Sequence, residues 1–254
     1  LMNLYPAITT ITPEERSHFL AVAKTVQTEI TVVPNGVGAE AVSGFSDRAR
    51  GRSVVFWGHL DFPPNWTSVK FFYEQVFLPH LADKDVAFEI IGRGGEAHLA
   101  EVFRDPRVIH HGFSKDLYAL LSRPGAMVNP MVEGGGLKNK VLEAFACGIP
   151  VVSTSLGLDG IAASDGRHCL IANNPEAFGS QVLAVLDSSH DWRKMAAEAR
   201  SLVLQKYSWT SAGRTLADCM FHVLLNRRPS LLSAGGERPA CDHPGNVSGS
   251  ERST

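Results

Sequence analysis

The sequence lacks a surplus of charge of either sign, because 24 Lys and Arg residues stand against 26 Asp and Glu residues and leave a formal net charge of −2. This balance argues against a general nucleic-acid partner. No apolar run approaches the roughly 20 residues that a helix needs to cross a bilayer, so no transmembrane segment is expected. Hydrophobic residues still make up 44% of the 254 residues, which is enough to bury a sizeable core.

The cysteines lack the spacing of a disulfide framework or a metal site. Cys147, Cys169, Cys219 and Cys241 include no CxxC pair, and three of them lie in apolar segments. Reduced core thiols, and hence a cytoplasmic location, are expected. The chain starts at Leu1 and shows no basic segment followed by an apolar stretch, as a signal peptide would, so it is interpreted as a possible fragment.

Several catalytic motifs are also missing. The sequence has no Walker loop, no GxSxG elbow and no zinc-ligand spacing. His110 and His111 are adjacent on a predicted strand and would point to opposite faces, which is poor geometry for one metal. Neither a metal site nor a cofactor is therefore expected.

Short β-branched runs alternate with helical patterns along most of the chain. Strands are predicted at 30–33, 53–58, 87–92, 108–111, 126–130, 150–154 and 168–172, and helices at about 65–79, 94–103, 115–122, 137–147, 175–187, 191–206 and 209–226. Such alternation predicts an α/β fold with a Rossmann-like parallel sheet and helices on both faces. Ligands of such sheets bind beyond the carboxyl ends of the strands.

The two ends of the chain differ from this body. Residues 1–28 show one helical pattern that starts with Thr12 as a cap and Pro13 in the first turn, and they are interpreted as the end of another domain and a hinge. Residues 29–226 form the predicted ligand-binding domain. Residues 227–254 are rich in Pro, Gly and Ser without periodicity, which predicts a disordered tail.

Residues 133–152, "EGGGLKNKVLEAFACGIPVV", carry the strongest local signal for a site. The glycines at 134–136 lie between a strand and a helix, where they let a ligand approach the backbone. The free N–H groups and the dipole of the helix start favour an anion. Lys138 and Lys140 cost about 0.3–1 kcal/mol each at that positive end unless an anion is bound. The alternative is that both lysines are simply solvated.

Glu143 follows in an almost wholly apolar stretch, so its carboxylate is expected to be partly buried and to need a partner. One candidate partner is Lys140, a turn earlier on the same helix. The other is a ribose diol, whose two hydroxyls can both donate to one carboxylate. The pattern alone does not decide between them.

Six blocks in order carry a family resemblance: "VVPNGV" (32–37), "VVFWGHLDFPPN" (54–65), "FEIIGRGG" (88–95), "VIHHGFSKDLYALL" (108–121), "MVNPMVEGGGLKNKVLEAFACGIPVVSTSLGLDGI" (127–161) and "YSW" (207–209). The sequence resembles the C-terminal, nucleotide-sugar domain of GT-B glycosyltransferases of the large retaining family 4 (glycosyl transferases group 1). It is similar to the branch with a GxGxKNKxLEA motif. The likeness covers about residues 8–226.

The resemblance implies a role for each matching position. Glu143 matches the second glutamate of the family's paired-glutamate motif, which holds the ribose of the donor. Gly135 stands where the first glutamate, which touches the donor sugar, is usual, and Glu133, two positions earlier, is a candidate substitute. Gly136 and Leu137 belong to the same loop.

A second departure concerns the diphosphate of the donor. The family has an arginine and a lysine after the first strand of this domain, whereas this chain has Gly58 and His59 and then residues 63–65, "PPN". Because a diphosphate needs counter-charge, Lys138 and Lys140 are expected to supply it. His59 either adds a hydrogen bond or is structural.

The nucleobase is expected against the loop after the fourth strand of the predicted set. The resemblance implies that the backbone of Gly112 and Phe113 reads the base edge, with Leu117 packing close by. Arg93 either reaches a phosphate or is a surface arginine. Residues 34–36, "PNG", match the hinge between the two domains, and also fit an ordinary Asn-Gly turn.

The sequence is therefore interpreted as the donor-binding half of a retaining glycosyltransferase of polysaccharide biosynthesis, with a nucleotide diphosphate sugar as donor. Its N-terminal acceptor domain is expected to be missing, which should leave exposed apolar surface where that domain packed and deprive the last helix of part of its usual contacts. The alternative is a truncated nucleotide-sugar-binding module without turnover of its own. A sugar-nucleotide epimerase would need acidic catalytic residues that the sequence does not reveal.

Overall fold

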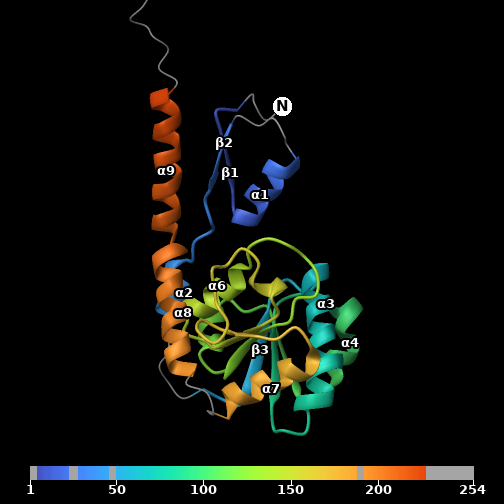
Figure 1. Cartoon of the computed structure of the whole chain (residues 1–254). Helices are drawn as coiled ribbons and strands as arrows, with labels where there is room; N and C mark the ends of the chain where they lie inside the picture. The colour runs from blue at the N-terminus through green and yellow to red at the C-terminus, as the bar shows by residue number, and fades with distance from the viewer. Residues whose placement is uncertain (1–4, 23–27, 46–49, 188–191, 227–254) are drawn as a thin grey trace, which may run out of the picture.

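The computed structural model describes residues 5–22, 28–45, 50–187 and 192–226. Its main body is a six-stranded sheet with the order β5-β4-β3-β6-β7-β8, in which all neighbouring strands are parallel (Figure 1). The strands are β3 (Ser53–Trp57), β4 (Ala87–Ile91), β5 (Val108–Gly112), β6 (Ala126–Asn129), β7 (Val151–Ser153) and β8 (Leu170–Ile171). The predicted α/β fold with a parallel sheet is confirmed.

Helices cover both faces of this sheet, so that its central strands are buried on both sides. One face packs against α3 (Pro63–Phe71), its π-helical continuation η2 (Phe72–Leu81), α4 (Glu96–Arg104) and α7 (Pro175–Leu186). The other packs against α2 (Ala39–Ser43), α5 (Leu117–Leu121), α6 (Asn139–Ala146) and α8 (Trp192–Lys206). A short 3-10 turn, η3 (Leu156–Leu158), follows β7.

The chain order reverses at the middle of the sheet. From β3 the chain moves outward through β4 to β5, and it then returns to β6 on the other side of β3. Connections that leave a sheet in opposite directions open a crevice at the carboxyl ends of the two central strands. The loops after β3 and β6 therefore meet at the place where a ligand site is expected.

The N-terminal residues form a separate β–α–β unit, in which β1 (Ala7–Thr10) pairs in parallel with β2 (Glu29–Val32) and α1 (Pro13–Val22) connects them. Thr12 caps α1, because its hydroxyl accepts a hydrogen bond from the backbone N–H of Glu15 at 3.1 Å. Two predictions need correction here. The strand expected at 30–33 does not join the main sheet, and a boundary at residue 28 cuts through this unit.

The last helix, α9 (Trp209–Asn226), extends beyond the six-stranded domain and runs alongside β2 (Figure 1). His222 on α9 lies 3.5 Å from the carboxylate of Glu29 on β2. The part of the chain that the structure describes contains no helix long and apolar enough to cross a membrane. The predicted disordered tail, 227–254, lies outside the described residues.

Candidate functional site

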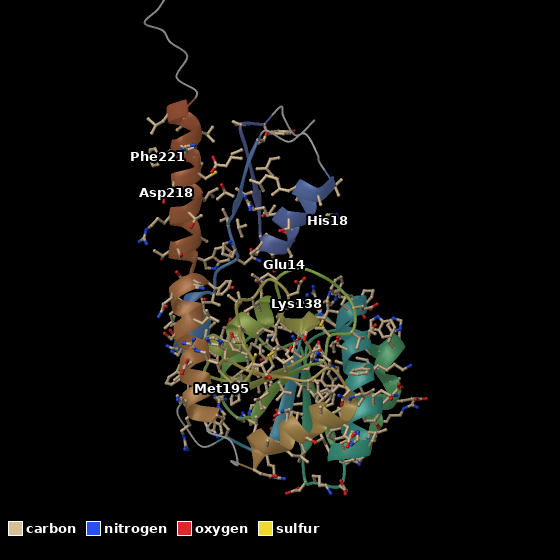
Figure 2. All side chains as sticks on the ribbon, in the orientation of Figure 1. Glu14, His18, Lys138, Met195, Asp218 and Phe221 are labelled. Carbon is tan, nitrogen blue, oxygen red and sulfur yellow. The ribbon has the colours of Figure 1, made fainter. Side chains whose placement is uncertain are left out.

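The loop and helix singled out in the sequence lie at the carboxyl end of β6. Helix α6 begins at Asn139, two residues later than predicted, so that Lys138 is its N-cap residue and Lys140 lies in its first turn. The apolar residues of α6 are buried against the sheet, and this packing fixes the direction in which its polar side chains leave the helix. Figure 2 shows Lys138 on the side of the domain that is turned toward α1.

Glu143 leaves α6 toward the end of β3. Its carboxylate accepts a hydrogen bond from the indole N–H of Trp57 at 3.1 Å. Burial raises the pKa of Glu143, while the bond from Trp57 and the charge of Lys140 oppose the rise. The partly buried carboxylate that the sequence predicts is thus present, and its hydrogen-bond partner is an aromatic side chain.

Lys140 has a different partner from the one that helix spacing suggested. Its ammonium donates to the amide oxygen of Asn65 at 2.6 Å and lies 4.0 Å from the ring centroid of Phe56. Burial, together with the charge of Lys138, lowers the pKa of Lys140 to about 7, and Glu143 opposes this. The interpretation of a simply solvated lysine is therefore wrong for Lys140, and the described residues contain no Lys140–Glu143 ion pair.

Lys138 is bound within its own loop. Its ammonium donates to the carbonyl oxygen of Gly136 at 2.7 Å, and only 9% of the residue is exposed. Burial lowers the pKa of Lys138, whereas the charge of Asp159 raises it. The sequence analysis gave Lys138 and Lys140 the same role, contact with the diphosphate, but their ammonium groups are bound by different elements.

The glycine loop before α6 needs glycine at two positions. Gly134 and Gly136 have φ angles of 88° and 78°, which L side chains rarely adopt. Gly135 has open space around the position that a Cβ would occupy. Glu133 is bound elsewhere, since its carboxylate accepts from the hydroxyl of Thr67 at 2.8 Å. Leu137 is half-buried and packs against the core on the α6 side.

A cavity of about 320 Å³ lies beside Trp57. It is lined by most of the residues that were predicted to contact the nucleobase or to follow the first strand of the domain. Its lining is Trp57, Gly58, His59, Ile91, Gly92, Arg93, Phe113, Ser114 and Leu117. Gly112 does not line it but provides the turn, with a φ of 64°. Phe113 is 70% exposed, and the imidazole of His59 lies 3.4 Å from Asp61.

Two residues of this region were not predicted as site residues from the sequence. Trp57 lines the cavity and donates to Glu143, and Asn65 binds Lys140. Both contacts join positions more than 70 residues apart, with separations of 86 and 75. No spacing rule within one helix or strand signals such contacts; only the β3–β6 neighbourhood, once known, makes them foreseeable.

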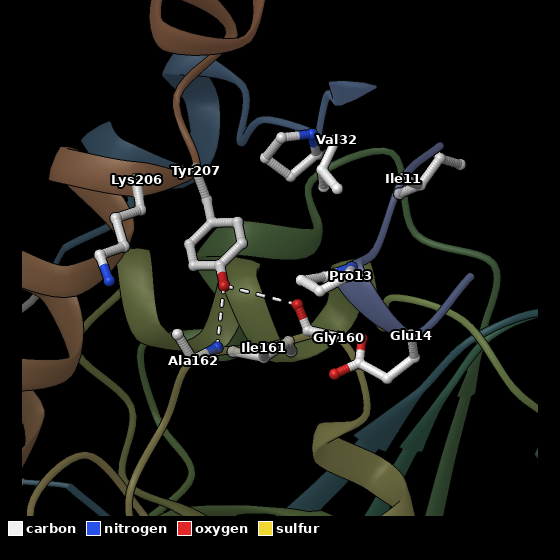
Figure 3. A pocket seen from close by; sticks show the side chains of 10 residues that line it. Ile11, Pro13, Glu14, Val32, Gly160, Ile161, Ala162, Lys206 and Tyr207 are labelled. Carbon is white, nitrogen blue, oxygen red and sulfur yellow. Dashed lines mark hydrogen bonds between the residues drawn. The ribbon is translucent and has the colours of Figure 1, made fainter. Parts of the chain in front are cut away.

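A second cavity, of about 230 Å³, lies between the N-terminal unit and the main domain (Figure 3). It is lined by Ile11, Pro13, Glu14, Val32, Pro34, Gly160, Ile161, Ala162, Lys206 and Tyr207. The hydroxyl of Tyr207 is already engaged, because it accepts from the N–H of Ala162 at 2.8 Å and donates to the carbonyl of Gly160 at 3.4 Å. Most of the lining is apolar, and its charged residues, Glu14 and Lys206, are of opposite sign.

The strand order, with the crevice at β3 and β6 flanked by a glycine loop, places the protein in the class of doubly wound α/β domains. Within this class the chain belongs to the family described as glycosyl transferases group 1, whose model matches residues 51–188. The resemblance inferred from the six sequence blocks is confirmed at this level.

Several individual proteins are similar to this chain. An uncharacterized 44.6 kDa protein in the cps region of Klebsiella pneumoniae is 24% identical over 165 residues, which is 61% of this chain and 42% of that protein. The crystal structure of TarM has a TM-score of 0.70 at 18% identity and is matched over 87% of this chain and 44% of its own. A glycosyltransferase from Rickettsia africae gives 0.72 at 14% identity, over 87% of this chain and 64% of its own.

A further solved structure, Anabaena Alr3699/HepE in complex with UDP and glucose, has a TM-score of 0.64 at 14% identity, over 86% of this chain and 64% of its own. These likenesses show the GT-B type of fold. The chain thus spans less than half of the Klebsiella relative and less than two thirds of these solved chains.

Proposed function

We propose that this chain is the donor-binding half of a retaining hexosyltransferase of family 4, which moves a sugar from a nucleotide diphosphate sugar to an acceptor hydroxyl. The observation that carries the proposal is the convergence of Glu143 and Lys140 at the carboxyl ends of β3 and β6. Trp57 joins the carboxylate to the wall of the 320 Å³ cavity. The Glu143 carboxylate can accept hydrogen bonds from the ribose of a nucleoside diphosphate, and the Lys140 ammonium can bind its diphosphate.

In this proposal the nucleotide spans the crevice. The base lies in the cavity against Phe113 and Leu117, the ribose hydroxyls donate to Glu143, and the diphosphate lies near Lys140 and the start of α6. The free N–H groups there and the ammonium stabilise the charge that the departing diphosphate gains as the bond to the sugar breaks. His59 and the glycine loop lie on the side of the diphosphate where the donor sugar is placed.

The base, the sugar and the place of action are also proposals. Because Alr3699/HepE was solved with UDP, a uracil nucleotide is the first ligand to test. Gly135 leaves open space where a donor sugar would lie, so backbone groups of the glycine loop, not a carboxylate at 135, would contact it. A cytoplasmic role in polysaccharide biosynthesis agrees with the position of the Klebsiella relative in a cps region.

We infer that activity requires a second domain, which provides the acceptor site. A two-stranded parallel sheet such as β1–β2 is rarely stable by itself, since parallel strands are normally covered on both faces within a larger sheet. The longer chains of the similar proteins support this interpretation. A nucleotide-sugar-binding module without turnover of its own is the second candidate, supported by the same difference in length.

Calorimetry tests the ribose assignment. UDP, GDP and ADP are titrated into the wild type, into Glu143→Gln and into Glu101→Gln, an exposed position on α4 that serves as a control. Glu143→Gln is expected to lose about 1–3 kcal/mol of binding free energy, as for a hydrogen bond to a charged group. Because burial raises the pKa of Glu143, removing its charge should not lower stability at neutral pH. Equal binding by wild type and Glu143→Gln would refute the assignment.

A further inference from the structure

The first turn of α3 places a polar side chain, Asn65, almost wholly inside the protein, with 8% of the residue exposed. The helix starts with Pro63 and Pro64, residues that suit a first turn because they have no N–H to leave unpaired. The backbone N–H of Asn65 donates to the carbonyl of Phe62 at 2.9 Å. Its side chain makes its hydrogen bonds outside its own helix.

Both ends of the Asn65 amide are used, on two different elements. The amide nitrogen donates to the carbonyl oxygen of His59 at 2.9 Å, in the loop after β3. The amide oxygen accepts from the ammonium of Lys140 at 2.6 Å, in the first turn of α6. Asn65 thus connects the two loops that form the crevice. Gly58 permits this arrangement, since a Cβ there would lie 2.7 Å from the amide nitrogen.

A neutral partner has a particular consequence for Lys140. A lysine side chain is long and flexible, and Glu143 lies three positions away on the same helix, close enough in such spacing for an ion pair. In the structure the ammonium binds the amide of Asn65 instead, and the carboxylate binds Trp57. An amide orients the ammonium without neutralising it, whereas a carboxylate would cancel the charge that an anion needs.

We propose that Asn65 is a positioning residue that holds the Lys140 ammonium at the crevice, separate from Glu143, so that its charge is available to the diphosphate of the donor. This inference rests on the proposed function. It assigns the task to a residue of α3 that does not itself line the cavity, that binds the loop after β3 through its amide nitrogen, and that acts on the diphosphate through Lys140.

The groups around Lys140 make this positioning measurable. Lys138 and Glu143 face it from α6, the ring of Phe56 from β3, and Asn65 from α3; His59 and Asp61 lie in the adjoining loop. The burial that these groups create lowers the pKa of Lys140 to about 7. A carboxylate at position 65 should raise this pKa, and an apolar residue should not.

The first experiment needs no ligand. Wild type, Asn65→Asp, Asn65→Leu and the control Thr67→Val, whose hydroxyl binds Glu133, are acetylated with acetic anhydride at a series of pH values, and modification of Lys140 is read by mass spectrometry. The pH at which Lys140 is half acetylated should rise in Asn65→Asp and should stay or fall in Asn65→Leu. Thr67→Val should behave like the wild type. Identical midpoints in all four proteins would overturn the contact between Asn65 and Lys140.

The second experiment measures UDP and uridine binding by calorimetry in two buffers of different ionisation enthalpy, at a pH above 7. Wild type should take up protons with UDP and not with uridine, because a diphosphate favours the ammonium form. Asn65→Asp and Asn65→Leu should each lose about tenfold or more in UDP affinity, as for a hydrogen bond involving a charged group. Uridine affinity should be unchanged, and proton uptake should vanish only in Asn65→Asp.

The outcomes separate the two proposals. If UDP, GDP and ADP bind the wild type no better than their nucleosides, the proposed function fails, while the acetylation midpoints still decide whether Asn65 positions Lys140. If UDP binds and both Asn65 variants bind it within about twofold of wild type, the positioning role is overturned. Equal loss of UDP and uridine would also overturn it, because a merely structural residue supports both ligands alike.

Discussion

At the scale of single residues, the two lysines of the "LKNK" segment are not equivalent. The Lys138 ammonium is bound to a carbonyl of its own loop, and that of Lys140 crosses the crevice to Asn65. A diphosphate at the carboxyl ends of β3 and β6 would therefore meet Lys140 first. Lys138 would stabilise the glycine loop and contribute to the field around the site.

The first prediction follows from this difference. Lys140→Met should lower the affinity for UDP by about 1.5–3 kcal/mol and leave uridine binding unchanged, because a charge-assisted contact is lost. Lys138→Met should have a smaller effect on UDP. Calorimetry with both ligands measures this, and a larger loss in Lys138→Met than in Lys140→Met would contradict the assignment of roles.

The second prediction concerns pH and stability. The folded-state pKa of Lys140 is about 7, below the ordinary value of 10.5, so between these values the unfolded chain binds more protons than the folded one. The free-energy cost of burying the Lys140 ammonium should therefore be at its full size below about pH 7, and it should disappear as the pH rises toward 10.5. Urea unfolding of wild type and Lys140→Met from pH 6 to 10 tests it, since their difference in stability should shrink with rising pH.

Residue patterns predicted some of this site and not the rest. An apolar neighbourhood in the sequence correctly indicated that the Glu143 carboxylate is partly buried. Its partner could not be deduced, because Trp57 lies on β3 whereas Glu143 lies on α6, and only the pairing of β3 with β6 brings α6 next to Trp57. For the same reason, helix spacing suggested Glu143 as the partner of Lys140, whereas the fold provides Asn65.

At the scale of elements, periodicity and β-branched runs predicted all six strands of the main sheet and all the helices that cover it except the five-residue α2, because each signal is local. These patterns missed β1, and they placed β2 in the main sheet although it pairs with β1. "AITT" is a four-residue run with no turn signal, and nothing in "EITV" states which strand it will pair with. The pairing of β1 with β2 joins residues about 20 positions apart, and local patterns do not reveal it.

The linker after β2 is fixed to the junction of α8 and α9. The N–H of Val37 donates to the carbonyl of Tyr207 at 2.8 Å, and Val37 forms an isolated parallel bridge with Ser208. The residues predicted as a hinge, 34–36, thus lead directly into a pinned segment. Asn35 adds a bond to Asn139 at the start of α6, at 3.1 Å.

The third prediction tests this junction. A Cβ on Gly36 would collide with the backbone of Trp209 and lie 2.6 Å from the carbonyl carbon of Ser208, so Gly36→Ala should destabilise by about 1–3 kcal/mol. Gly213→Ala on α9 is the matched control: its Cβ meets open space, and it should stabilise by roughly 0.5–1 kcal/mol. Thermal unfolding of both variants measures this, and equal effects would contradict a tight junction.

At the scale of the whole molecule, α9 leaves much apolar surface uncovered. Exposed apolar residues on α9 include Leu216, Met220, Phe221, Leu224 and Leu225, with exposed fractions of 41–65%. Figure 2 shows Phe221 on the part of α9 that extends beyond the six-stranded domain. Exposed apolar surface is therefore present on the last helix. That a second domain covers it in a longer protein is part of the proposed function.

The last prediction uses this surface. Contiguous apolar patches on monomers usually mark interaction sites, so the isolated chain should self-associate through α9 as its concentration rises. Phe221→Gln with Leu224→Gln should weaken this association, because each buried apolar side chain contributes roughly 1.5–3 kcal/mol. Leu204→Gln, a single exposed leucine on α8, is the control and should change nothing. Sedimentation equilibrium measures the masses, and UDP affinity should be the same in all variants because α9 does not contact the crevice. A wild type that stays at 27.5 kDa at every concentration would contradict the prediction and leave α9 without a role as an interface.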